Sequence, residues 1–278
     1  MTVTLTVLCE NTVGRPSRAI GEHGFSCLIE TPEGNYLFDT GQGLGLRHNA
    51  EILGKKLSSI RGIVLSHGHI DHTGGLVKAL GEVGNVDIFA HPEIFRRRYW
   101  VGMHERRSIG IPFLRERLEE LGARFVLERD FVRLTPRIWL TGEVPRTTSF
   151  ERRDPHLMAR EEGGGPLVPD LFSDDLSLVI DSPRGLVVVL GCAHAGLINI
   201  LRHVVEKTGR RDIHAVIGGT HLGPAGDEQF TATLAALKTF GVEKIGVSHC
   251  TGQGRAAQLQ AEFPGRFFFA SVGAVLEL

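Results

Sequence analysis

Residues 66–75 read Ser66-His67-Gly68-His69-Ile70-Asp71-His72-Thr73-Gly74-Gly75 and are the most informative part of the chain. They follow residues 62–65, a compact apolar run of the kind that forms buried strands. In an extended loop, His67 and His69 point the same way and can supply two imidazoles to one cation. Asp71 and His72, turned by the start of a following helix, can face a second cation. Imidazole and carboxylate suit zinc, manganese or iron, and two such ions about 3.5–4 Å apart can clamp attacking and leaving oxygens.

Metal-compatible side chains follow four other apolar runs in the same way: His194 after 187–193, His221 after 216–220, His249 after 245–248 and Asp39 after 36–38. In α/β sheets, ligands bind beyond the carboxyl ends of the strands. Five strands are therefore expected to bring such groups to one edge. The competing interpretations are a histidine-rich surface turn without metal at 67–72, and strand-end histidines that only hydrogen-bond within their loops.

The composition is that of a globular chain and excludes several kinds of partner. Of 278 residues, 42% are hydrophobic, and 31 basic side chains meet 32 acidic ones for a net charge of -1. This length predicts a single domain spanning residues 1–278. The near-neutral charge argues against nucleic acid, and the lack of an apolar run of about 18 residues argues against a membrane. A small-molecule substrate is expected, and a homo-oligomer is allowed.

Cysteine usage and the first ten residues favour the cytoplasm. The four cysteines lie far apart without CxxC spacing, at Cys9, Cys27, Cys192 and Cys250. Residues 1–10 alternate Thr with Val and Leu and lack a basic region followed by a long apolar run, so no signal peptide is expected.

The pattern of short apolar runs and amphipathic stretches predicts an α/β architecture. Strands are expected at 2–8, 25–30, 35–39, 62–66, 86–90, 124–126, 137–141, 176–181, 186–190, 213–217 and 244–248. Helices are expected at 51–57, 76–80, 196–207 and 228–240. Thr31-Pro32-Glu33-Gly34 has the residues of a tight hairpin turn.

Two segments do not fit this alternation. Residues 92–121 are charged and are expected to form an inserted helical flap, interrupted near Gly110-Ile111-Pro112. Residues 146–175 are polar and glycine-rich, which predicts a mobile loop over a site or simple disorder. The run Arg96–Arg98 could meet a substrate phosphate, but such runs usually form solvated helix faces, so it is not a predicted site.

Residues 67–72 resemble the metallo-β-lactamase fold superfamily, whose H-x-H-x-D-H loop they match at every fixed position. The resemblance covers nearly the whole chain. It implies a four-layered αββα sandwich, with two mixed sheets flanked by helices and the metals at the rim between the sheets. It also implies that Asp39 orients the metal loop through hydrogen bonds and that His249 is a ligand of the second cation.

The middle of the family pattern differs in this chain. Gly191-Cys192-Ala193-His194 stands where the family has a Gly-Asp motif, so Cys192 takes the place of the bridging carboxylate. His194 is interpreted as the third ligand of the first cation, and His221 could replace or supplement it. Cys192 either bridges the cations as a thiolate or is a buried core cysteine.

A more specific resemblance rests on residues 22–26, 65–69, 191–200, 218–222 and 249–252. These motifs are similar to those of 7,8-dihydropterin-6-methyl-4-(β-D-ribofuranosyl)aminobenzene-5'-phosphate synthases. That likeness implies a transferase that joins a pterin carrying a diphosphate leaving group to an aryl ribose phosphate. It makes His23 and His221 candidate contacts for substrate phosphate.

The expected function is that of a dinuclear metal-dependent hydrolase acting on a small phosphorylated substrate. Its two divalent ions are expected to be zinc, with manganese or iron as alternatives. A bridging water would lose its proton near neutral pH, and the predicted catalytic residues are Asp71, which orients this water, and His221. In the alternative transferase, the same ions would act as Lewis acids on the diphosphate.

A third hypothesis is a non-catalytic metal-binding or redox protein. A sensor site would be closed by protein ligands, whereas catalytic sites keep an open position. Diiron redox relatives carry a carboxylate where His69 stands, so His69 favours Lewis-acid chemistry.

Overall fold

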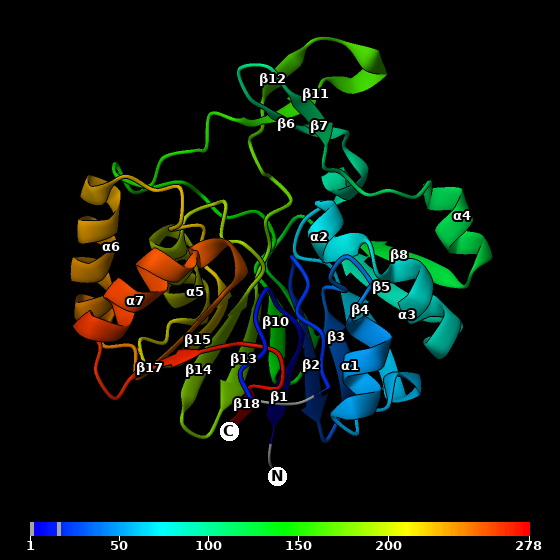
Figure 1. Cartoon of the computed structure of the whole chain (residues 1–278). Coiled ribbons are helices and arrows are strands. Elements are labelled where there is room, and N and C mark those ends of the chain that lie inside the picture. The colour runs from blue at the N-terminus through cyan, green and yellow to red at the C-terminus, as the bar shows by residue number, and fades with distance from the viewer. Residues whose placement is uncertain (1–2, 16–17) are drawn as a thin grey trace.

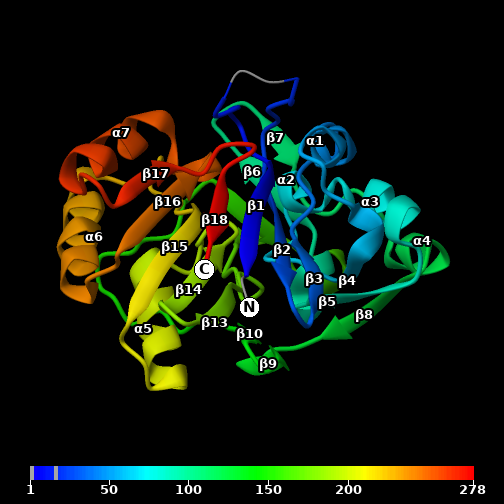
Figure 2. The ribbon, with the colours of Figure 1, turned by 90° about the horizontal axis from the view of Figure 1, so that it is seen from below.

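The computed structural model describes residues 3–15 and 18–278, which form two sheets packed face to face between two layers of helices (Figure 1 and Figure 2). From edge to edge, the first sheet consists of β18 (Val275–Glu277), β1 (Thr4–Cys9), β2 (Ser26–Thr31), β3 (Gly34–Phe38), β4 (Ile60–Val64), β5 (Val86–Ala90) and β8 (Ala123–Leu127). The second consists of β17 (Phe267–Phe269), β16 (Lys244–Ser248), β15 (Ile213–Gly219), β14 (Gly185–Leu190), β13 (Leu178–Ser182), β10 (Ile138–Leu140) and β9 (Val132–Thr135).

Helices cover the outer face of each sheet (Figure 2). Beside the first sheet lie α1 (Leu46–Ile52), α3 (Leu76–Val83) and α4 (Arg115–Glu120), with the 3-10 helix η1 (Leu57–Ser59). Beside the second lie α5 (Leu197–Thr208), α6 (Asp227–Phe240) and α7 (Gln253–Glu262). The inner faces of both sheets share one apolar cluster that includes Phe25, Phe38, Leu178 and Val189. Two further clusters lie between each sheet and its helices, so the predicted αββα sandwich is confirmed.

The two sheets have the same order of strand directions. Antiparallel pairs run from β18 to β3 and from β9 to β14, and parallel pairs continue to β8 and β17. All six residues of β14 are buried, as expected for a central strand with both faces covered. The strands that precede the candidate site residues therefore end at one rim between the two facing sheets. They are β3 and β4 in the first sheet and β14, β15 and β16 in the second. The sequence predicted one edge, and the structure divides it between two sheets.

The predicted hairpin at Thr31–Gly34 is confirmed. Thr31 pairs with Gly34, so Pro32 and Glu33 form a two-residue loop between β2 and β3. Gly34 has a φ of 144°, a conformation that L side chains rarely adopt, and a Cβ there would meet the Arg61 side chain.

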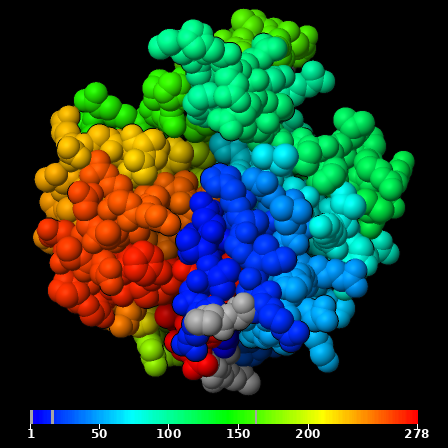
Figure 3. All heavy atoms as spheres, in the orientation of Figure 1, coloured from blue at the N-terminus to red at the C-terminus, as the bar shows by residue number. Residues whose placement is uncertain are grey.

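A small third sheet rises above the sandwich (Figure 3). Its strands, in spatial order, are β12 (Leu167–Pro169), β11 (Leu157–Arg160), β6 (Arg98–Val101) and β7 (Arg106–Ser108). It joins the two segments that were predicted separately, the flap at 92–121 and the loop at 146–175. The paired residues of β11 and β6 are about 60 positions apart in the sequence. A pairing over that distance produces no local periodicity from which it could be predicted.

Several local predictions are corrected by the structure. Segment 92–121 is helical only at the 3-10 helix η2 (Pro92–Phe95) and at α4, with the β6–β7 hairpin between them, because Tyr99 and Trp100 favour a strand. Segment 146–175 contains β11, β12 and the 3-10 helix η3 (Glu162–Gly164). The helix predicted at 51–57 lies instead at 46–52, where Leu46, Asn49 and Ala50 are buried on one face.

Short or polar elements were missed altogether: β9, α7, β17 and β18. Residue 2 of the strand predicted at 2–8 lies outside the described residues. Across residues 3–15 and 18–278, no helix has both the length and the apolar character needed to cross a membrane.

Candidate metal centre

The loop from β4 into the short helix α2 (Ile70–Thr73) is held in place by Asp39 at the end of β3. The Asp39 carboxylate accepts hydrogen bonds from the Ser66 backbone N–H at 2.7 Å and from Ser66 Oγ at 2.6 Å. It also accepts from His72 Nδ1 at 2.6 Å. Asp39 is fully buried, so this one carboxylate fixes both ends of the loop.

His67, His69 and His194 form the deep half of the centre. The Nδ1 atom of His67 lies 2.9 Å from Ser66 Oγ, which directs its Nε2 toward the centre. That Nε2 lies 3.0 Å from Nδ1 of His69, and the ring of His194 lies 4.8 Å from the ring of His67. His194 Nε2 is buried without a hydrogen-bond partner, as is His69 Nε2. Buried imidazole nitrogens without partners fit a cation.

The deep half is electrically neutral. Burial lowers the pKa of His67, His69 and His194 well below the usual value, and neighbouring imidazoles lower it further for His67 and His194. The neutral imidazole is the form that binds a metal, so these side chains need not lose a proton when a cation enters.

Asp71, His72 and His249 form the second half, and Cys192 lies between the halves. The Cys192 Sγ atom lies 3.2 Å from His72 Nε2. His249 Nε2 lies 3.1 Å from Asp71 Oδ2, and the opposite nitrogen of His249 donates to Asn11 Oδ1 at 2.9 Å. Two candidate ligand groups share the thiol, namely His67–Cys192–His194 and His72–Cys192–His249, each with its ligand atoms within 4.8 Å of one another.

The second half carries charge. Burial opposes a charged His72, but the Asp39 and Asp71 carboxylates outweigh it and raise the pKa of His72 to about 9. Burial likewise works against an ionised Asp71, but His72, His23 and His249 prevail and hold the pKa of Asp71 well below its usual value. A cation entering this half would replace a proton on His72.

Cys192 is both buried and placed at the junction of the two ligand groups. Burial, followed by the neighbouring Cys250, raises the pKa of the Cys192 thiol well above its usual value. A thiolate here would need a cation beside it. The sequence left two interpretations of Cys192. A bridging thiolate requires bound metal, whereas a buried thiol does not.

The predicted substrate contacts lie on opposite sides of the centre. His23 is 62% exposed, and its Nε2 lies 3.3 Å from Asp71 Oδ2, so it adjoins the second half. The ring of His221 lies 4.4 Å from that of His194, and its Nε2 lies 3.6 Å from Asp154 Oδ2. Among the described residues, His194 belongs to a candidate ligand group, whereas His221 and His69 do not. A third group consists of His23, Asp71 and His249.

Strained backbone surrounds the centre. In the part of the chain that the structure describes, five non-glycine residues have positive φ angles, and all are site residues or their neighbours: Asp39, Phe172, Ala193, His221 and His249. Such conformations cost about 1–3 kcal/mol each and persist only where the surrounding structure enforces them. The chain therefore gives up stability to place these side chains at the rim.

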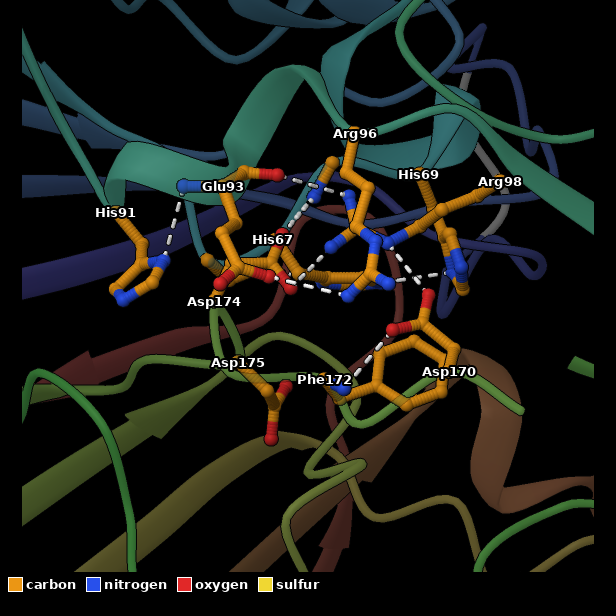
Figure 4. A network of polar contacts seen from close by, with 12 residues as sticks. His67, His69, His91, Glu93, Arg96, Arg98, Asp170, Phe172, Asp174 and Asp175 are labelled. Carbon is orange, nitrogen blue, oxygen red and sulfur yellow. Dashed lines mark hydrogen bonds and ion pairs between the residues drawn. The ribbon is translucent and has the colours of Figure 1, made fainter. Parts of the chain in front are cut away.

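Two supports of the deep half were missed by sequence analysis (Figure 4). The Phe172 ring stacks on His194 with centroids 4.0 Å apart. Arg98 is 1% exposed and binds Asp170 at 2.8 Å and Asp174 at 2.6 Å, and Asp174 also accepts from the Gly68 N–H at 2.8 Å.

Arg98 therefore corrects the interpretation of Arg96–Arg98 as a solvated face. Its guanidinium connects the small sheet to the metal loop, and Gly68 has no room for a Cβ, which would lie 2.1 Å from the Ile94 carbonyl oxygen. The available signal was an arginine in a segment of aromatic residues, but its carboxylate partners lie more than 70 residues away.

Comparisons with known proteins show the family and agree with the fold. A family model for the metallo-beta-lactamase superfamily matches residues 20–249. The 7,8-dihydropterin-6-methyl-4-(beta-D-ribofuranosyl)-aminobenzene-5'-phosphate synthase of Methanocaldococcus jannaschii is 34% identical, with 99% of this chain and 96% of that protein covered. An uncharacterized protein of the same organism is 27% identical, covering 98% of this chain and 99% of that protein. The crystal structure of a metal-dependent hydrolase of the beta-lactamase superfamily matches with a TM-score of 0.85, 28% identity and 99% of both chains covered.

Proposed function

The chain belongs to the metallo-beta-lactamase superfamily, and on this basis we propose that it is a dinuclear metal-dependent hydrolase acting on a small phosphorylated substrate. The observation that carries the proposal is the pair of adjacent ligand groups that share Cys192. A single structural ion would need only one of them.

We assign the deep cation to His67, His69 and His194 and the second cation to Asp71, His72 and His249, with Cys192 between them. The donors are mostly imidazole nitrogens together with one thiol and one carboxylate, a set that suits zinc better than magnesium or calcium. When bound, two such ions would supply Lewis-acid chemistry, lowering the pKa of water and stabilising negative charge on phosphate oxygens.

The side chains around the centre would bind and orient the substrate. The Asp71 carboxylate stays ionised, so it can orient a water molecule by accepting a hydrogen bond from it. Burial disfavours a charged His221, but Asp154 and Cys250 outweigh it and raise the pKa of His221 to about 9. A hollow beside His194 and His221 is also lined by Arg152 and Arg153, which would attract a phosphate group.

The test begins with metal content by plasma mass spectrometry on protein purified without added metal. The protein is then assayed against chromogenic phosphodiesters, phosphomonoesters and lactones, with Asp71→Asn as the inactivating variant and Asp87→Asn, at the Arg124 surface pair, as the matched control. About two zinc ions per chain and turnover that only Asp71→Asn abolishes would support the proposal. Protein that binds no metal after reconstitution would refute it.

A second candidate is the transferase reaction, favoured by the 34% identity with the synthase over almost the whole chain. Here the same ions would stabilise a diphosphate leaving group instead of activating water. Release of pyrophosphate from a pterin diphosphate only when an aryl ribose phosphate is present would identify this reaction. Release without the acceptor would indicate hydrolysis.

The cytoplasm is the proposed location. All four cysteines are free, and three of them are buried, which suits a reducing compartment. Labelling of accessible thiols in intact cells and in lysates would test this, because a protein held in an oxidising compartment would show disulfides.

A further inference from the structure

A cavity of about 840 Å³ lies outside the metal centre. Four arginines line it, namely Arg96, Arg97, Arg129 and Arg160, together with two acidic residues, Glu93 and Glu161, and Phe95 among others. None of its lining residues belongs to the candidate metal-ligand groups found in the described part of the chain. The cavity is therefore a separate feature, and the proposed hydrolase chemistry gives it no role.

The cavity exists only in the folded chain. Its walls come from η2 and the residues after it, from the connection between β8 and β9, from the end of β11, and from Gly163 and Gly164. The wall at Glu93 is fixed, because its carbonyl oxygen accepts from Arg98 Nη1 at 3.5 Å and Arg98 is held by the buried Asp170 and Asp174. A cavity with fixed walls binds a ligand at a lower entropic cost than a loop that must first become ordered.

Positive charge in the cavity is only partly neutralised. Arg96 Nη1 lies 3.3 Å from Glu93, and Arg129 donates to Glu143 at the edge. Arg160 instead donates to two carbonyl oxygens, those of Gly164 at 3.3 Å and Gly165 at 2.9 Å.

Arg97 is exposed, and no described residue forms an ion pair or hydrogen bond with its side chain. Two guanidinium groups, those of Arg97 and Arg160, thus face the cavity without an acidic partner.

We propose that this cavity is a binding site for an organic phosphate, separate from the metal centre. The phosphate would lie between Arg97 and Arg160, because planar guanidinium groups can donate two parallel hydrogen bonds to its oxygens. An aromatic or apolar portion of the ligand would lie against Phe95 and Pro92, which provide the cavity's uncharged wall. The volume is far larger than a phosphate ion needs, so the ligand is an organic molecule that carries phosphate. This site goes beyond the proposed hydrolase function and does not depend on it.

The test uses phenylphosphonate as the probe, since its carbon–phosphorus bond resists hydrolysis at a metal centre. Binding to the metal-loaded protein is measured by calorimetry for the wild type, Arg97→Glu and Arg107→Glu. Arg107 is the matched control because it lies on β7 of the same small sheet, 59% exposed and paired with Glu105. We expect Arg97→Glu to weaken this binding about 10- to 100-fold, as expected for the loss of a charged hydrogen bond. Arg107→Glu should have no effect.

Phenylphosphonate can also bind at the metal centre. The His69→Ala variant distinguishes binding there from binding in the cavity. Binding that survives His69→Ala and disappears in Arg97→Glu supports the cavity. Binding that disappears in His69→Ala and survives in Arg97→Glu refutes it, as does a complete absence of binding at millimolar probe. Metal content and hydrolysis are measured on Arg97→Glu in parallel, so failure of this proposal is distinguishable from failure of the hydrolase assignment.

Discussion

The deep and the second half of the metal centre bury polar groups in opposite ways. In the deep half, His67, His69 and His194 are neutral, and His194 Nε2 has no partner. In the second half, Asp71 and His72 are charged, and each has partners of its own: Asp71 pairs with His23 and His249, and His72 contacts Asp39 and Cys192. In the deep half, buried nitrogen atoms have no hydrogen-bond partner and only a cation would satisfy them. In the second half, the polar groups already have partners without metal. Unpartnered buried groups are costly, so the deep half gains more from a bound ion.

The difference implies an order of loading. A cation entering the deep half replaces no proton on His67, His69 or His194 and relieves an unsatisfied nitrogen. A cation entering the second half must displace the proton of His72 and disturb the contacts of Asp71 with His23 and His249. We therefore expect the deep ion to bind first and more tightly.

Removing a deep ligand should have the largest effect. His67→Ala is expected to lose the deep ion and to lower turnover by about 10³-fold or more, since a Lewis-acid ion supplies several kcal/mol of transition-state stabilisation. Metal content and turnover are measured together. The matched control is His104→Ala, at an exposed position in the β6–β7 hairpin. A variant that keeps both ions would show that the deep half is not a metal site.

Cutting the shared support should separate the halves. Asp39→Asn replaces an acceptor of three hydrogen bonds with a group that must donate at one of them, and it is expected to weaken the second ion about 10- to 100-fold through His72. Ser66→Ala removes the Oγ contacts to His67 Nδ1 and to Asp39 but keeps the bond between Asp39 and His72, so it should weaken the deep ion instead. Zinc affinities of both variants come from competition with a chelating dye. Equal losses at both sites in both variants would contradict the division into halves.

The halves should also differ in their dependence on pH. Because the pKa of His72 is raised to about 9, its proton is present at pH 7 and must leave when the second ion binds. Affinity of the second half should therefore rise about tenfold per pH unit from pH 7 to 9. The imidazoles of the deep half, with pKa values below the usual one, should add no such dependence, so the comparison is made in Cys192→Ser, which lacks the ionisable proton of the shared thiol.

Calorimetry of zinc binding in two buffers of different ionisation enthalpy would measure the protons released by each ion. Similar proton release from both ions would contradict the assignment of charge. In the same titration, the His72→Ala variant should release no proton when the second ion binds.

The smallest expected effect tests the aromatic support of the deep half. Phe172→Leu removes the ring stacked on His194 but keeps an apolar side chain at the same strained position. Affinity for the deep ion should fall about 2- to 10-fold, in keeping with the energy of an aromatic pair. The matched control is Phe131→Leu, whose ring contacts His203 instead. An unchanged deep ion in Phe172→Leu would show that packing does not hold His194.

Much of the metal centre was predictable because its signals are local. His67, His69, Asp71 and His72 lie within six residues, and the end of a buried strand places them at a sheet rim whatever the rest of the chain does. The remaining histidine candidates, His194 and His249, were predictable because each follows an apolar run, at β14 and β16. The positions of Arg98 and Phe172 could not be predicted, because the side chains that they contact are distant in the sequence.

The α/β alternation, the strand ends that carry histidines and the motif at 67–72 follow from residue order, since such patterns act over a few neighbouring residues, whereas the αββα layers were implied by the family resemblance. Folding adds what depends on distance in space. It placed His194 rather than His221 in a ligand group with His67, joined β6 to β11 in a third sheet, and formed an arginine-lined cavity from three separate segments. Contacts between residues far apart in the chain arise from packing of whole faces, and no single stretch of sequence encodes such a face by itself.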